Sequence, residues 1–103
     1  MPSAVHADLV GTYNADPRPA LDCHWLETAD GVVQMAWPPG WHRLYDPPRL
    51  VSIETGQVIN VGDQVGLDGS FTQEEGEYCN MHLHADAPKF NATAVVYVAG
   101  PSE

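Results

Sequence analysis

The stretch "GDQVGLDG", residues 62–69, decides which kind of fold this chain can adopt. Apolar side chains at Val65 and Leu67 alternate with polar residues and glycine, which is the two-residue period of a strand with one buried face. Glycine inside a strand indicates a bulge, a sharp bend or a close approach of another backbone. Bends of this kind occur where a sheet turns a corner of a barrel. The stretch therefore predicts a strand that curves along the wall of a β-barrel.

Alternation of the same kind continues along the chain. Three stretches, "AVHADLVGTYN" (residues 4–14), "LDCHWLE" (residues 21–27) and "VVQMAW" (residues 32–37), place apolar or small residues at every second position. None of them has the 3.6-residue period of an amphipathic helix, so we expect strands. The predicted inward positions are Val5, Ala7, Leu9, Gly11 and Tyr13 in the first stretch, Leu21, Cys23 and Trp25 in the second, and Val33, Met35 and Trp37 in the third.

Turn-forming residues separate the predicted strands. "ADG" (residues 29–31) and "TG" (residues 55–56) are typical of hairpin turns. "WPPG" (residues 37–40) interrupts a longer segment, because its two prolines remove two backbone N–H donors from any strand ladder. We interpret that segment as one strand that bends to serve two sides of a barrel. Further strands are expected in "RLVSIE", "QVINV" and "ATAVVYVA".

Short strands at regular spacing predict an all-β fold in a single domain, residues 1–103. The closest standard form is a small OB-like β-barrel of about five main strands. An immunoglobulin-like β-sandwich is the alternative. One segment, "SFTQEEGE" (residues 70–77), is expected to form a short helix or a loop, with Ser70 or Thr72 as its N-cap.

Composition argues against several classes of partner. The chain carries a formal net charge of −10, and its fixed positive charges are Arg18, Arg43, Arg49 and Lys89. Nucleic acid binding needs clustered Lys and Arg, so these scattered cations argue against nucleic acid and against an anionic membrane surface. No apolar run approaches the roughly 20 residues of a transmembrane helix. Residues 1–10 lack the basic and apolar regions of a signal peptide, and we expect an extracytoplasmic protein, secreted or at the cell surface, without its leader.

The two cysteines, Cys23 and Cys79, predict one disulfide. If residues 78–85 form a strand, Cys79 lies on the face opposite to His82 and His84, because side chains alternate along a strand. Both cysteines then lie on inward faces. A bridge across a loop of this length stabilises a protein by about 4 kcal/mol on the chain-entropy estimate. Two buried free thiols in a cytosolic core are the alternative.

The stretch "CNMHLHAD" (residues 79–86) also suggests a metal site. His82 and His84 lie at alternate positions, and a pair of imidazoles on one strand face binds zinc or copper when neighbouring groups supply further ligands. Asp86 on the same strand is a candidate ligand, as is His24, which the alternation of its own strand places on an outward face. We favour a solvated strand face without a metal, and therefore a protein without a cofactor; the zinc or copper site is the alternative.

The sequence lacks the usual motifs of catalysis. It contains no G-x-S-x-G elbow, P-loop or dinucleotide fingerprint, so an enzyme is disfavoured. Aromatic residues gather instead in "WPPGWHRLY" (residues 37–45), where Trp37, Trp41 and Tyr45 could stack on a sugar, a peptide or a base, with Arg43 orienting an anionic group. The same aromatic side chains could equally close one end of a small barrel.

These motifs resemble those of a group of small secreted or lipid-anchored actinobacterial proteins. The group shares an early strand cysteine, W-P-P-G, a G-D-x-V-x-L-x-G stretch and a late cysteine. The matching positions are Cys23, Trp37, Pro38, Pro39, Gly40, Gly56, Gly62, Asp63, Val65, Leu67, Gly69 and Cys79. The resemblance implies an extracytoplasmic β-domain with paired cysteines, and it implies no activity.

Two hypotheses of different class follow from the sequence. The first is a non-catalytic, disulfide-linked β-barrel module outside the cytoplasm that binds a small molecule or a protein. The second is a zinc- or copper-binding protein that uses the face carrying His82 and His84.

Overall fold

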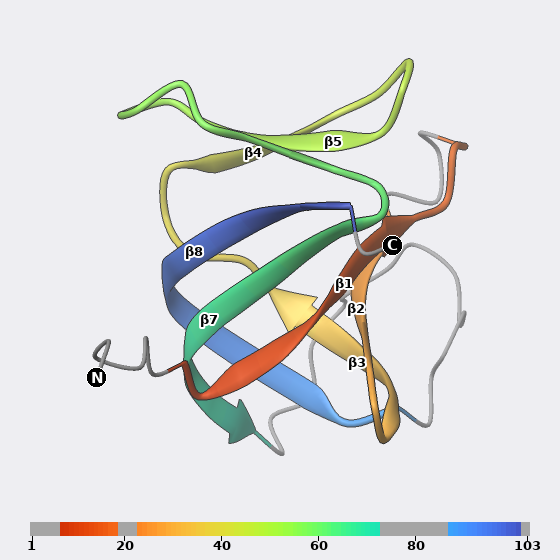
Figure 1. Ribbon diagram of the computed structural model, residues 1–103, viewed down its shortest axis with the longest axis vertical. Coiled ribbons are helices and arrows are strands. Elements are labelled where there is room, and N and C mark those ends of the chain that lie inside the picture. Colours follow the sequence, from red (N-terminus) through yellow and green to blue (C-terminus); the bar gives the residue numbers. More distant parts are fainter. Residues whose placement is uncertain (1–6, 19–22, 73–86, 102–103) are drawn as a thin grey trace.

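The computed structural model describes residues 7–18, 23–72 and 87–101, which form eight β-strands (Figure 1). Their bounds are β1 (Leu9–Ala15), β2 (His24–Thr28), β3 (Gly31–Ala36), β4 (Trp41–Leu44), β5 (Arg49–Ser52), β6 (Val58–Asn60), β7 (Asp63–Thr72) and β8 (Lys89–Pro101). These three ranges contain no helix. Consequently no helix long and apolar enough to cross a membrane is found in the described part of the chain.

Five of the strands close into a barrel in the order β1-β2-β3-β8-β7. All neighbours in this ring are antiparallel except β3 and β8, which run parallel. The strands β1, β2 and β3 are neighbours both in the chain and in the barrel. The last strand, β8, lies beside β3, and β7 lies between β8 and β1. This arrangement confirms the predicted all-β, OB-like barrel. The alternative of a two-sheet sandwich is wrong.

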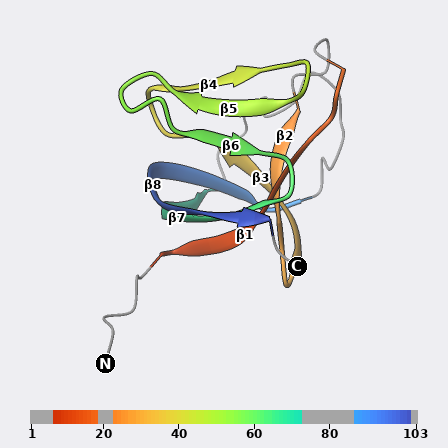
Figure 2. The ribbon, with the colours of Figure 1, turned by 45° about the horizontal axis from the view of Figure 1, so that its top comes forward.

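The other three strands form a separate antiparallel sheet, β4-β5-β6, which lies over one end of the barrel (Figure 2). The prediction of a single bent strand through residues 37–40 is therefore wrong. β3 ends at Ala36, and the two prolines that follow cannot donate to a ladder, so the chain leaves the barrel there. It returns where the N–H of Gly62 donates to the carbonyl of Tyr13, 2.9 Å away.

One apolar core joins the barrel to the small sheet. Leu50 on β5 and Ile59 on β6 are completely buried and pack in the same cluster as the inward residues of the barrel. The buried members of this cluster are Tyr13, Ala15, Leu26, Val33, Met35, Leu50, Ile59, Val65, Leu67, Phe90 and Ala92. The small sheet thus acts as a lid whose inner face completes the barrel core.

Glycines in β7 allow its close approach to β8, as the sequence predicts. A Cβ atom on Gly66 would lie 2.3 Å from a ring carbon of Tyr97, its cross-strand partner. Gly69 has a φ of +153°, and a Cβ there would lie 2.1 Å from the carbonyl oxygen of Asn91. Register shifts accompany both positions, so β7 curves as it follows β8. The prediction of a curved barrel-wall strand is confirmed.

The predicted inward and outward faces of β2 are interchanged in the structure. His24 and Leu26 are buried, whereas Trp25 lies on the outer face. Leu26 stands directly opposite Tyr13 of β1, and both side chains point into the core. Because side chains alternate, this pairing turns Trp25 outward and His24 inward. The alternation of Cys23 with Trp25 suggested the opposite.

The proposed helix cap at residues 70–72 is also wrong, because Ser70 and Thr72 belong to β7. Strand β7 runs ten residues and stays paired with β8 up to Thr72. The rest of the expected helix or loop, residues 73–77, lies outside the described residues.

The shared core predicts that the small sheet and the barrel unfold together. Leu50→Ala should lower the free energy of unfolding by about 2–5 kcal/mol, because it removes a completely buried side chain and leaves a cavity. Denaturant unfolding followed by circular dichroism measures this. The control is Ile53→Ala in the turn directly after β5, where the residue is 69% exposed and the expected change is within about 0.5 kcal/mol. Two separate transitions in the Leu50→Ala protein would contradict a single cooperative unit.

Candidate functional site

The turn at residues 37–40 brings two tryptophans together. Trp37 follows directly after β3, and Trp41 begins β4. Between them Gly40 has a φ of +88°, a conformation that favours glycine, and the N–H of Trp41 donates to the carbonyl of Pro38 at 3.4 Å. One indole thus belongs to the barrel layer and the other to the small sheet.

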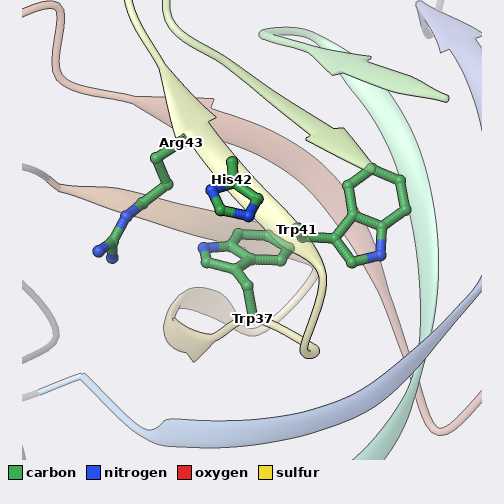
Figure 3. Close-up of a pocket in the computed structure, with 4 residues that line it drawn as sticks. All are labelled: Trp37, Trp41, His42 and Arg43. Atoms are coloured by element: carbon green, nitrogen blue, oxygen red, sulfur yellow. The ribbon is translucent and has the colours of Figure 1, made fainter. Parts of the chain in front are cut away.

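These tryptophans line an open pocket of about 370 Å³ together with His42 and Arg43. Both indoles are half-buried, while His42 and Arg43 are exposed. In the view of Figure 3, Trp41 and Arg43 lie to either side of the Trp37 ring, and His42 lies next to it. The pocket therefore brings two indole rings close to one permanent positive charge, and most of the surface that it exposes is polar.

Trp37 connects this pocket to the barrel core. Its indole packs edge-on against the ring of Tyr13, with centroids 5.7 Å apart and an interplanar angle of 75°. The indole N–H, at Nε1, is buried and has no hydrogen-bond partner among the described residues. A buried donor without an acceptor costs about 1–3 kcal/mol. This donor has no surface that a ligand in the pocket could reach, so the cost falls on the folded chain itself.

A buried hydrogen-bonded chain runs behind the pocket. The Tyr13 hydroxyl bonds to Nδ1 of His24, and Nε2 of His24 bonds to the Tyr45 hydroxyl at 3.0 Å. A neutral imidazole has one N–H and one acceptor nitrogen, and each hydroxyl can donate or accept. Both bonds therefore form with an uncharged His24, which explains how a histidine that is only 2% exposed is tolerated in the core.

Burial raises the pKa of the Tyr13 hydroxyl well above its ordinary value of 10.0. Neighbouring Tyr45 acts in the same direction, whereas the positive charge of Arg43 acts in the opposite direction. The positive charge of Arg43 thus acts on the buried Tyr13 hydroxyl as well as on the pocket. Tyr13 therefore stays protonated, and its hydroxyl holds His24 in place.

The other described arginines have structural partners at other places. Arg18 pairs with Asp16 at 2.8 Å, and this ion pair holds the pKa of the Asp16 carboxyl down at about 2. Arg49 donates to the carbonyls of Tyr45 and Pro47, at 3.1 and 2.8 Å, and so ties the turn between β4 and β5. Among the described arginines, Arg43 is the one that lines the aromatic pocket.

The structure thus places three of the four predicted ligand-binding residues together. Trp37, Trp41 and Arg43 share the pocket, while the Tyr45 hydroxyl bonds to His24. Sequence reasoning missed His42 as a lining residue. Its position between Trp41 and Arg43 on one short segment was the available signal.

The predicted metal ligands are only partly described. His24 is not on an outward face as expected, and both of its ring nitrogens are engaged in hydrogen bonds. His82, His84 and Asp86 lie outside the described residues, so their role remains a prediction. Within the described ranges, no group of three or more His, Cys, Asp or Glu residues is arranged to hold a metal ion.

Of the two cysteines in the predicted disulfide, Cys23 lies among the described residues. Cys23 is completely buried just before β2, and its carbonyl accepts the N–H of Asp16 at 2.9 Å. Cys79 lies outside the described residues, so the pairing remains a prediction.

Comparisons with known proteins add no relative to this description. No protein-family model, no curated protein and no solved structure matches the chain.

The hydrogen bond between Tyr13 and His24 predicts a distinct pH dependence of stability. Tyr13→Phe should lower the free energy of unfolding at neutral pH by about 1–3 kcal/mol, because the buried Nδ1 of His24 loses a partner. The raised pKa of Tyr13 has a second effect. Above about pH 10 the unfolded chain releases the tyrosine proton while the folded chain keeps it, so wild-type stability falls as pH rises.

Urea unfolding from about pH 7 to about pH 11 tests both effects. The decline in stability above about pH 10 should be smaller in Tyr13→Phe than in the wild type. Tyr97→Phe, which removes a hydroxyl from a half-buried tyrosine of β8, is the control at neutral pH. Equal declines in the wild type and Tyr13→Phe would show that Tyr13 is not the group responsible.

Proposed function

We propose that this protein is a non-catalytic binding module, and that the pocket between Trp37 and Trp41 takes a small ligand with a flat face. The observation that carries the proposal is the pocket itself, where two half-buried indoles and Arg43 meet. Its volume, about 370 Å³, lies at the lower end of the roughly 300–1,000 Å³ typical of small-molecule sites.

The side chains indicate the chemical class of the ligand. Flat apolar faces stack on indoles, and such stacking contributes about 1–3 kcal/mol in nucleic acid complexes. Arg43 favours a carboxylate or a similar anion, because its guanidinium donates charge-assisted hydrogen bonds. We therefore expect an aromatic or other planar anion.

The pocket offers little for catalysis. Its described lining holds two tryptophans, a histidine and an arginine, and none of these side chains is a hydroxyl, thiol or carboxylate nucleophile. The buried His24, which could act as a base, is occupied by two tyrosine hydroxyls. Binding without turnover is therefore the function that the side chains support best.

Indole N–H signals in proton–nitrogen NMR spectra provide a direct test. Indole-3-acetate is the planar anionic probe, indole-3-acetamide its uncharged analogue, and gluconate an anion without a flat face. We expect indole-3-acetate to shift the Trp37 and Trp41 signals and to leave Trp25, on the outer face of β2, in place. Trp41→Ala should weaken binding about tenfold or more through lost stacking, and Arg43→Gln about fivefold through lost charge.

The matched control is Arg18→Gln, which removes one positive charge from the exposed ion pair with Asp16. It should bind indole-3-acetate as the wild type does. The proposal fails if millimolar indole-3-acetate leaves the Trp37 signal unchanged, or if gluconate binds as well as the planar anion.

We further propose that the module works outside the cytoplasm with a disulfide between Cys23 and Cys79. The complete burial of Cys23 supports this pairing, because a buried sulfur is protected from reductants. The resemblance of the two-cysteine pattern to extracytoplasmic proteins supports it as well.

Intact mass with and without reductant, on protein prepared in an oxidising compartment, tests the disulfide. We expect reduction to add the mass of two hydrogens and to lower the free energy of unfolding by about 4 kcal/mol. Native spectra recorded with zinc or copper test the histidine hypothesis in the same samples. An unchanged mass on reduction, with both thiols reactive beforehand, would remove the disulfide from the proposal.

A further inference from the structure

A second pocket lies at the other end of the barrel, away from the small sheet. The start of β1, the hairpin between β2 and β3, and the end of β7 meet there, and Figure 1 shows them far from β4 and β5. Its volume is about 320 Å³. Strand β3 runs from this pocket to the aromatic one, so the two sites lie at opposite ends of the molecule.

The floor of this pocket is apolar, and apolar side chains form part of its rim. Val33 belongs to the core and is 4% exposed, and Leu9 packs against the same core. Above this floor, Val10 is 39% exposed and Phe71 is 56% exposed. Phe71 is held in position because its ring meets Phe90 edge-on, with centroids 5.1 Å apart. The folded chain therefore presents an ordered apolar opening into its own core.

Acidic groups border this opening. Asp8 and Asp30 are the only charged residues of its described lining. The Asp8 carboxylate accepts the N–H of Gly69 at 3.0 Å, which holds it at the rim. Asp30 is exposed in the hairpin turn, where its own N–H donates to the Thr28 hydroxyl at 3.2 Å. The lining thus combines apolar side chains with two carboxylates, which complements a segment that carries an apolar side chain next to cations.

We propose that this opening docks a basic segment of a partner protein, with one aromatic or aliphatic side chain inserted between Lys or Arg neighbours. The carboxylates would attract the basic residues, and the formal charge of −10 on the whole chain would add to that attraction. The inserted side chain would cover Val10 and Phe71, which the folded monomer leaves in water.

The test uses acetyl-Lys-Phe-Lys-amide as the probe and proton–nitrogen NMR shifts as the readout. We expect shifts at the backbone amides of Val10, Asp30 and Phe71. Acetyl-Glu-Phe-Glu-amide should not bind, and acetyl-Lys-Ala-Lys-amide should bind more weakly. The double variant Asp8→Asn/Asp30→Asn should weaken binding of the probe about tenfold and reduce its dependence on salt. Asparagine retains an oxygen that can accept the Gly69 N–H.

A double variant at other surface acids, Glu54→Gln/Asp68→Asn, is the matched control, because it removes the same charge from positions outside the pocket. It should bind the probe nearly as well as the wild type. Equal binding of the Lys and Glu peptides would overturn the proposal, as would shifts at the Trp37 indole in place of Val10 and Phe71. Binding to phosphatidylglycerol vesicles that is lost in Phe71→Ala would assign the opening to a lipid surface and also overturn it.

Discussion

Three residue pairs between β3 and β8 hold the barrel closed. Gln34, Met35 and Ala36 align with Lys89, Phe90 and Asn91 in the parallel pair, and the N–H of Gln34 also donates to the carbonyl of Pro88 at 2.8 Å. Without this short ladder the five strands would form an open sheet with two exposed edges. The ladder forms because β8, thirteen residues long, pairs with β3 at its start and with β7 along its length. The curvature that this requires depends on the glycines of β7.

Closure determines where the two candidate sites lie. A closed barrel has two ends, and in this molecule different elements lie at each end. The small sheet covers one end through Leu50 and Ile59, and the aromatic pocket forms at the junction of the two layers. Among the described residues, strand ends and a hairpin border the other end, where Phe71 and Val10 are exposed.

Much of the barrel could be predicted from local alternation. Val33, Met35, Val65 and Leu67 occupy inward positions as expected. Val65 and Leu67 alternate with glycine and polar residues, and Val33 and Met35 share the parity that lacks a polar residue. The stretch at residues 21–27 is ambiguous, since Cys23 and Trp25 compete with Leu26. The register was decided there by Tyr13, which stands opposite Leu26 and lies outside the stretch itself.

The candidate sites also differ in how far the sequence alone could predict them. Trp37, Trp41 and Arg43 were predictable as a group because seven consecutive residues and one proline turn contain them. The burial of His24 was not predictable, because its partners Tyr13 and Tyr45 are 11 and 21 residues away. The second opening draws on residues from Asp8 to Pro88, so only the closed barrel brings them together.

The two walls of the aromatic pocket belong to different layers, and this has a thermodynamic consequence. Trp37 extends from a barrel strand and Trp41 from the small sheet, so a ligand that touches both bridges the layers. Linkage then couples occupancy to folding, because a ligand that binds only the docked arrangement stabilises it. The coupling is reciprocal, so loosening the sheet at a distance must weaken the site. A rise in melting temperature with ligand concentration would record this coupling.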